Sequence, residues 1–126
     1  ALRTGALEAR NGSKIEMKHS STAGVGAHGG CLAARSVVLS TGSTMVLENC
    51  STTVEHSWGG ALAADRLVIL DSGVLTVEAS GTLARESRGG GLAVGSAEIQ
   101  GELRVANAFT ATARGEGGGV WAGSLT

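Results

Sequence analysis

The sequence predicts an all-β chain that folds as a parallel β-helix, a stack of about four similar rungs with three short strands in each rung. The first observation is a repeat, because pairs of glycines that precede a small and an aliphatic residue begin at Gly29, Gly59, Gly89 and Gly117. The second is an alternation of apolar and polar residues inside each repeat, which is typical of strands with one buried face. The third is the composition, with 21 glycines and no proline among 126 residues. Proline would interrupt the ladder hydrogen bonds that every rung must donate.

The glycine pairs divide a single segment, 1–126, into the repeats 5–34, 35–64, 65–94 and 95–122. We number the positions of each repeat from 1 to 30 and call a set of equivalent positions a column. A two-residue deletion near Gln100 brings the last repeat into register. Columns 3, 5, 11, 13, 28 and 30 are apolar in all four repeats, and column 11, for example, holds Ile15, Met45, Leu75 and Leu103. We expect these six columns to form the core.

Each repeat is predicted to hold strands at columns 3–5, 11–13 and 28–30, since these segments are too short for helices. Turn residues fill the gap between the first two strands, as in Asn11-Gly12-Ser13 and Thr41-Gly42-Ser43. Columns 17–24 form a long loop that differs most between repeats. The glycine pairs are expected at tight bends where a side chain would clash. Successive rungs would then stack about 4.8 Å apart.

Charged residues support this register, because neighbours in a column lie side by side and should alternate in sign. One pair is of like sign, Glu48 beside Glu78. Trp58 shares a column with Arg88, which suggests a cation–π stack. The pairs of opposite sign are Arg35 with Asp65, Lys18 with Glu48, Glu55 with Arg85, Glu86 with Arg114 and Arg88 with Glu116.

Both ends of the segment match partial repeats, the first four residues columns 27–30 and the last four columns 1–4. Solenoids need capped ends. We therefore expect this segment to be internal to a longer chain, or to have its ends covered by partners.

The glycine motif resembles the GGA[ILV] repeats of the chlamydial polymorphic membrane protein family. Gly59-Gly60-Ala61-Leu62 is a full copy, whereas the other three copies differ at the third place. The family's FxxN motif is matched by Leu47-Glu48-Asn49-Cys50 and Val105-Ala106-Asn107-Ala108 only in part, since phenylalanine is absent. The resemblance implies a right-handed β-helix and a surface-exposed adhesin or autotransporter passenger.

Several functions are disfavoured by the composition. A net charge of −1 lacks the basic footprint of a nucleic-acid binder, and no apolar run is long enough for a membrane span in this segment. The three histidines occupy different columns and no CxxC motif exists, so we expect no metal site. Glu16 and Glu78 are the nearest approach to a pair of free outward carboxylates, two columns and two rungs apart. We therefore expect no catalytic residues, no cofactor and no enzyme activity.

The long loops are the predicted binding region, with Trp58, Arg88 and Arg114 as the partner-binding residues, because tryptophan and arginine often anchor interfaces. The partners would be proteins, glycans or neighbouring subunits of an assembly; a merely solvated loop is the alternative. Two sequons begin at Asn11 and Asn49. Asn11 is the predicted N-glycosylation site because it lies in a turn, whereas Asn49 is expected to be too buried.

Three further columns have structural interpretations. The asparagines of column 15, Asn49 and Asn107, are expected to point inward and to bond along the stack, with a ligand contact as the alternative. The threonines of column 18 are expected to bond the loop backbone, with an ice-binding array as the alternative. Cys31 and Cys50 are expected to be two small buried thiols, with a bridge across the loop mouth as the alternative.

Together these features predict a structural, adhesin-like scaffold segment of a larger surface or secreted repeat protein, located at the cell surface or outside the cell. The alternative is that the segment supplies non-catalytic rungs of a carbohydrate-active β-helix enzyme.

Overall fold

The computed structural model of the chain describes residues 2–22, 29–52, 58–82, 91–110 and 119–126, and these residues are all-β. None of them lies in a helix, so the described part of the chain offers no apolar helix that could cross a membrane.

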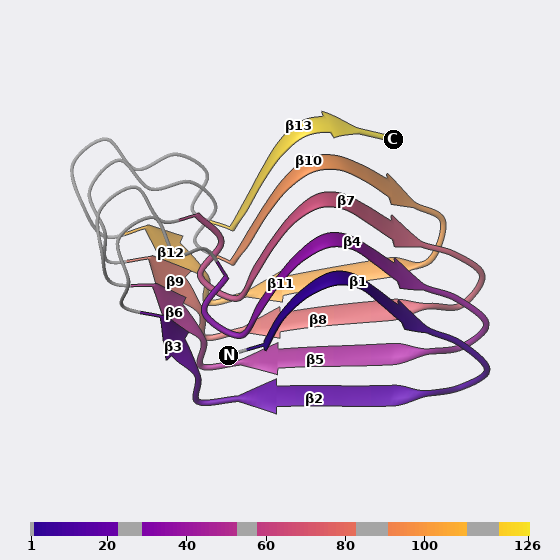
Figure 1. Cartoon of the computed structure of the whole chain (residues 1–126), viewed down its shortest axis with the longest axis horizontal. Coiled ribbons are helices and arrows are strands. Elements are labelled where there is room, and N and C mark those ends of the chain that lie inside the picture. Colours follow the sequence, from indigo (N-terminus) through magenta and orange to yellow (C-terminus); the bar gives the residue numbers. More distant parts are fainter. Residues whose placement is uncertain (1, 23–28, 53–57, 83–90, 111–118) are drawn as a thin grey trace.

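The described residues form thirteen strands in three open, wholly parallel sheets (Figure 1). The first sheet contains β1 (Leu2–Ala9), β4 (Leu32–Leu39), β7 (Leu62–Ile69), β10 (Leu92–Ile99) and β13 (Val120–Leu125). The second contains β2 (Lys14–Lys18), β5 (Thr44–Glu48), β8 (Val74–Glu78) and β11 (Glu102–Ala106). The third contains β3 (Ser21–Thr22), β6 (Ser51–Thr52), β9 (Gly81–Thr82) and β12 (Phe109–Thr110).

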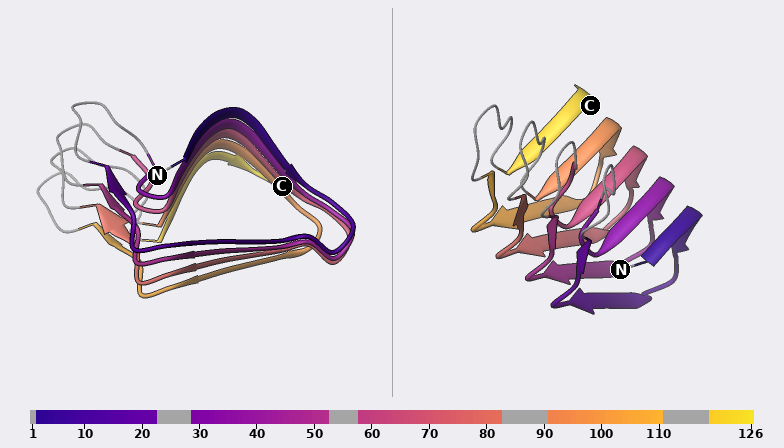
Figure 2. Two further views of the ribbon diagram at one scale, coloured as in Figure 1. Left: turned by 60° about the horizontal axis from the view of Figure 1, so that its bottom comes forward. Right: turned by 60° about the vertical axis from the view of Figure 1, so that its left-hand side comes forward.

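The strands of each sheet follow one another at the spacing of the glycine motifs. Leu32 pairs with Leu62 and Leu62 with Leu92, an offset of 30 residues, and Leu92 then pairs with Val120 after the shorter last repeat. The second and third sheets keep the same offsets. Each repeat therefore lies directly beside the next along one stacking axis (Figure 2).

The predicted division of a repeat into strands is wrong in one respect. Columns 28–30 and 3–5 belong to a single eight-residue strand, such as Leu32–Leu39, and the third strand is a two-residue one at columns 17–18. The pairing passes over column 1, at Gly5, Arg35 and Asp65, where the strands of the first sheet arch (Figure 1). The register is the same on both sides of column 1, so all strands bend together there, and this bend lets columns 30 and 3 both face the core although they are three residues apart.

The core is aliphatic and lies between the sheets, as the alternation predicts. In the two middle repeats the side chains of columns 3, 5, 11, 13 and 28 are all completely buried. Columns 3, 11 and 28, for example, contribute Val37 and Leu67, Met45 and Leu75, and Leu62 and Leu92. No described aromatic side chain takes part in the core cluster, so rows of stacked aliphatic side chains hold the sheets together.

The turns between the first and second sheets contain the predicted turn residues. Residues Asn11 and Gly12 both have positive φ, 56° and 73°, and Thr41 and Gly42 repeat this geometry at 52° and 71°. Each turn also bonds to the next one along the stack, because the Gly12 N–H donates to the Thr41 carbonyl at 2.9 Å and the Gly42 N–H to the Asp71 carbonyl at 3.1 Å.

The glycine pairs lie at tight bends, as predicted. Gly59 has a φ of 67°, and a Cβ there would lie 2.0 Å from the Leu62 carbonyl oxygen. A Cβ on Gly30 would lie 2.1 Å from the carbonyl oxygen of Gly60 in the next repeat. These contacts involve backbone atoms, so no side-chain rearrangement could relieve them.

Candidate functional site

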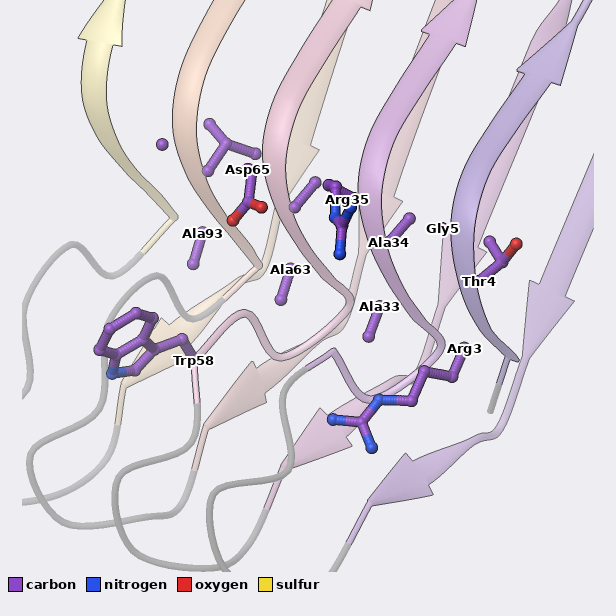
Figure 3. Close-up of a pocket in the computed structure, with 13 residues that line it drawn as sticks. Arg3, Thr4, Gly5, Ala33, Ala34, Arg35, Trp58, Ala63, Asp65 and Ala93 are labelled. Atoms are coloured by element: carbon purple, nitrogen blue, oxygen red, sulfur yellow. The ribbon is translucent and has the colours of Figure 1, made fainter.

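A groove of about 670 Å³ crosses the first sheet on its outer face, where the strands begin to arch (Figure 3). Its thirteen lining residues come from the first halves of β1, β4, β7 and β10, together with Trp58. The groove therefore runs along the stacking axis, across four parallel strands, and its shape follows from the arch of these strands.

The floor of the groove is a row of alanines in column 29. Ala33, Ala63 and Ala93 occupy equivalent places on three adjacent strands, in register with one another, and Figure 3 shows them in one line. Alanine contributes only a methyl group, so the surface is hollow here and apolar. Column 28 on one side points toward the core, whereas column 30 packs against the core and also lines the groove. Within column 29, Ala33 and Ala63 are partly exposed, and Ala93 is buried with only 4% of its surface exposed.

Charged and aromatic side chains surround this floor. Arg3 lies at the β1 end of the alanine row, and Arg35 and Asp65 lie on the arch of β4 and β7 (Figure 3). Within the part of the chain that the structure describes, these three side chains form no ion pair or hydrogen bond. Trp58 forms the opposite wall with 37% of its surface exposed.

Trp58 is the only predicted partner-binding residue that can be placed. Its carbonyl accepts the Gly29 N–H at 2.9 Å, which joins the end of one loop to the next repeat. Arg88 and Arg114 lie outside the described residues, and so does the predicted stack of Trp58 with Arg88.

The sequence interpretation missed Arg3, Arg35, Asp65 and the alanine floor as a group. The sequence predicted that Arg35 and Asp65 are neighbours of opposite charge along the stack, but it did not predict that they line a groove. The available signal was column 29, which stays small in three successive repeats although it faces outward.

The exposure of the sequon asparagines agrees with the prediction for Asn11 and differs from it for Asn49. Asn11 lies in an exposed turn, as predicted, but Asn49 is also exposed, so the prediction that it is too buried is wrong. Column 15 forms a left-handed corner in every repeat, with φ values of 53°, 52°, 50° and 53° at His19, Asn49, Ala79 and Asn107. This corner turns the Asn49 side chain outward, where its Nδ2 lies 3.4 Å from the His19 Nδ1. The contact along the stack exists, but it is on the surface.

The prediction of two free thiols is also wrong, since Cys31 and Cys50 form a disulfide with a Cα–Cα distance of 5.4 Å. Both residues are completely buried. Cys31 precedes β4 and Cys50 follows β5, so the bond closes the cross-section of the stack below the loop, which was the alternative interpretation. Columns 27 and 16 face each other in a later repeat as well, because a Cβ on Gly91 would lie 3.1 Å from that of Ala108.

The threonines of column 18 pair in register from Thr22 through Thr52 and Thr82 to Thr110. Thr52 is completely buried, and its hydroxyl has no hydrogen-bond partner. The expected bond to the loop backbone is therefore wrong for Thr52, because its side chain faces the interior.

Most of the described surface carboxylates of the second sheet are paired with cations. Glu16 is not free, because the Lys14 Nζ lies 2.7 Å from the Glu16 Oε1. The hydrogen bond and the positive charge of Lys14 lower the pKa of the Glu16 carboxyl. The predicted ion pair of Lys18 and Glu48 is confirmed, with the Lys18 Nζ 3.3 Å from the Glu48 Oε2. Glu78 lies beside Glu48 in the register, also as predicted. Among the described residues, no three His, Cys, Asp or Glu side chains gather as metal ligands would.

No protein-family model matches the chain, and no curated protein or solved structure matches it either. The geometry of the stack and of the groove therefore carries the functional argument.

Proposed function

We propose that this chain is a right-handed parallel β-helix of about four rungs that serves as a structural, adhesin-like scaffold in a larger surface or secreted protein, with no catalysis of its own. Its glycine motifs resemble the GGA[ILV] repeats of the polymorphic membrane proteins. A scaffold of this kind holds binding surfaces at a fixed spacing, because each rung adds the same short length to a rigid stack.

The observation that carries the proposal is the unbroken register. Three parallel sheets advance together, by 30 residues at each step and by 28 at the shorter last one, and columns 3, 5, 11, 13 and 28 remain in the core from one repeat to the next. Such a core can be extended by further repeats, since every repeat buries its apolar side chains against those of its neighbours. The design favours length and stiffness over a single enclosed active site.

The disulfide supports a location outside the reducing cytoplasm. Disulfides persist mainly in secreted and surface proteins, and the Cys31–Cys50 bond closes the interior of the stack. A second observation agrees with a structural role, because three of the described carboxylates of the second sheet pair with cations on its surface, Glu16 with Lys14, Glu48 with Lys18 and Glu102 with Arg104.

Deletion of one complete repeat tests the scaffold. Removal of 65–94 joins Ala64 to Gly95 and leaves every column intact, so we expect a folded protein with a cooperative unfolding transition. Small-angle scattering should show a stack that is shorter by about 5 Å. The matched control removes 65–79, half a repeat, which shifts every later column and should abolish folding.

Two results would overturn the proposal. If the 30-residue deletion unfolds the protein as completely as the 15-residue deletion, the repeats are not interchangeable rungs. If antibodies against this segment label the source cells only after permeabilisation, and the segment is absent from the medium, the extracellular location is wrong.

A further inference from the structure

We propose that the groove across β1, β4, β7 and β10 binds an extended acidic glycan, a chain of sugars that carry carboxylate or sulfate groups. This inference deepens the proposed function, because it names the class of partner and the surface that holds it. It places the binding surface on the outer face of the first sheet rather than in the long loops.

The floor fits the apolar face of a sugar chain. A pyranose ring exposes C–H groups on its faces and hydroxyls around its edge, so its face can lie on the partly exposed methyl groups of Ala33 and Ala63. The row continues from Arg3 across four strands, a length of about 14 Å at the usual strand spacing. That length suits an oligosaccharide that follows the stacking axis better than it suits a single sugar.

The wall supplies an aromatic surface beside the floor. Trp58 lines the groove and exposes 37% of its surface. An indole ring combines a large apolar face with a polar edge, which matches the C–H face and hydroxyl edge of a pyranose. Contact with both the alanine floor and the indole would fix the orientation of one sugar ring.

The charges at the β1 end of the groove and along the arch favour an acidic ligand. Arg3 and Arg35 contribute two guanidinium groups against the single carboxylate of Asp65, in a chain whose net charge is −1. Guanidinium groups bind carboxylate and sulfate-like oxyanions through paired N–H donors. Asp65 can accept hydrogen bonds from hydroxyls of a neighbouring sugar. Because no described residue neutralises these three groups, their hydrogen-bonding capacity is available to a ligand.

The main chain of the groove disfavours an extended peptide. The strands that form the floor are inner strands, and their N–H and C=O groups are engaged in the sheet on both sides. A peptide bound there could not add to a sheet edge and would have to leave many of its own amide groups without partners. A glycan carries no peptide groups and avoids that penalty.

Calorimetric titration of the intact, oxidised chain tests the proposal in about 0.15 M salt. The probes are a heparin hexasaccharide, hexagalacturonate and the neutral maltohexaose. We expect binding of at least one acidic hexasaccharide and weaker binding of the neutral one. Arg35→Gln should weaken acidic binding about tenfold or more, since it removes a charged hydrogen-bond donor.

The floor is tested by Ala63→Leu, which fills the centre of the groove without touching the core and should weaken binding at least as much. Its matched control is Ala106→Leu, at an exposed place on β11. Arg66→Gln is the matched control for Arg35→Gln, because Arg66 is exposed on β7 but does not line the groove. Both controls should bind like the parent chain.

Four results would overturn the proposal: no binding of any hexasaccharide, equal binding of the neutral one, binding unchanged by Ala63→Leu, and equal weakening by the control variants. A hexaglutamate peptide that binds with the same dependence on Arg35 and Ala63 would also overturn it in favour of an acidic peptide. None of these results touches the scaffold itself, because urea unfolding of the same variants and the repeat deletion report on the fold separately.

Discussion

Replacing Cys31 by alanine and Cys50 by serine would open the disulfide while leaving side chains that the next repeat already carries in the same two columns. Ala61 occupies the column of Cys31 and Ser80 that of Cys50. In the parent chain the Ser80 hydroxyl donates to the Glu78 carbonyl at 3.0 Å, and the Cys50 sulfur already lies 3.4 Å from the equivalent Glu48 carbonyl. The packing change is therefore small, and the effect should come from the lost cross-link.

The size of that effect follows from the length of the closed loop. The two cysteines are separated by 19 residues, and closing a loop of that length in the unfolded chain is worth about 3 kcal/mol. We therefore expect C31A/C50S to reduce the free energy of unfolding by about 3 kcal/mol. Urea unfolding followed by circular dichroism measures this change, and the reduced parent chain should give a similar value.

The reciprocal variant moves the cross-link by one repeat. Ala61→Cys with Ser80→Cys, made in the C31A/C50S background, should form a disulfide that closes the next cross-section. The gain should be smaller, about 1 kcal/mol, because the Ser80 hydroxyl is lost. That hydroxyl accepts from the Cys50 N–H at 3.2 Å and donates to the Glu78 carbonyl at 3.0 Å, and each bond is worth about 1 kcal/mol.

Failure of the moved disulfide to form in the folded, oxidised protein would refute the reasoning, because columns 27 and 16 would then not face each other in successive repeats. A loss of less than about 1 kcal/mol in C31A/C50S would refute the loop-closure account instead. Intact mass with and without alkylation decides the first point, and the urea midpoints decide the second.

Three other predictions concern single positions. Gly59→Ala should reduce the free energy of unfolding by more than about 2 kcal/mol in urea titrations. Gly42→Ala, with a φ of 71° but open space around the added Cβ, should reduce it by only about 1 kcal/mol. Equal losses would contradict the clash between a Cβ at position 59 and the Leu62 carbonyl. Ala79→Asn should raise the melting temperature, since asparagine tolerates the left-handed φ of 50° better than alanine; an unchanged or lower value would contradict this. Lys14→Met should raise the pKa of Glu16 in an NMR titration, because the hydrogen bond from Lys14 lowers that pKa in the parent chain. This hydrogen bond stabilises the fold at pH values above the unfolded pKa of Glu16. Its contribution is lost as the pH falls through the lower pKa of the folded state.

The parallel register and the core columns could be predicted because every repeat places its side chains in the same surroundings. Leu32, Leu62 and Leu92 lie side by side, so a period of 30 residues in the sequence maps directly onto neighbours in space. The turns at Asn11-Gly12 and Thr41-Gly42 were predictable for a different reason, since few residues adopt positive φ easily.

The features that the sequence did not predict depend on the shape of the cross-section rather than on its period. The bend at Arg35 interrupts the alternation of faces, so one strand looked like two. The pairing of Cys31 with Cys50 requires knowing that columns 27 and 16 meet across the interior. The groove could not be recognised from the sequence because its floor is made of alanines, whose small and unreactive side chains match no binding or catalytic motif.

The bonds between successive turns have a consequence for hydrogen exchange. In most proteins the amides of exposed turns exchange with solvent faster than those of the strands they connect. Here the Gly12 and Gly42 amides donate to carbonyls of the next turn at 2.9 Å and 3.1 Å, as a strand amide donates to the neighbouring strand. These two surface amides should therefore retain deuterium labels about as long as the β-sheets do, and their release should report the opening of neighbouring repeats rather than local fraying.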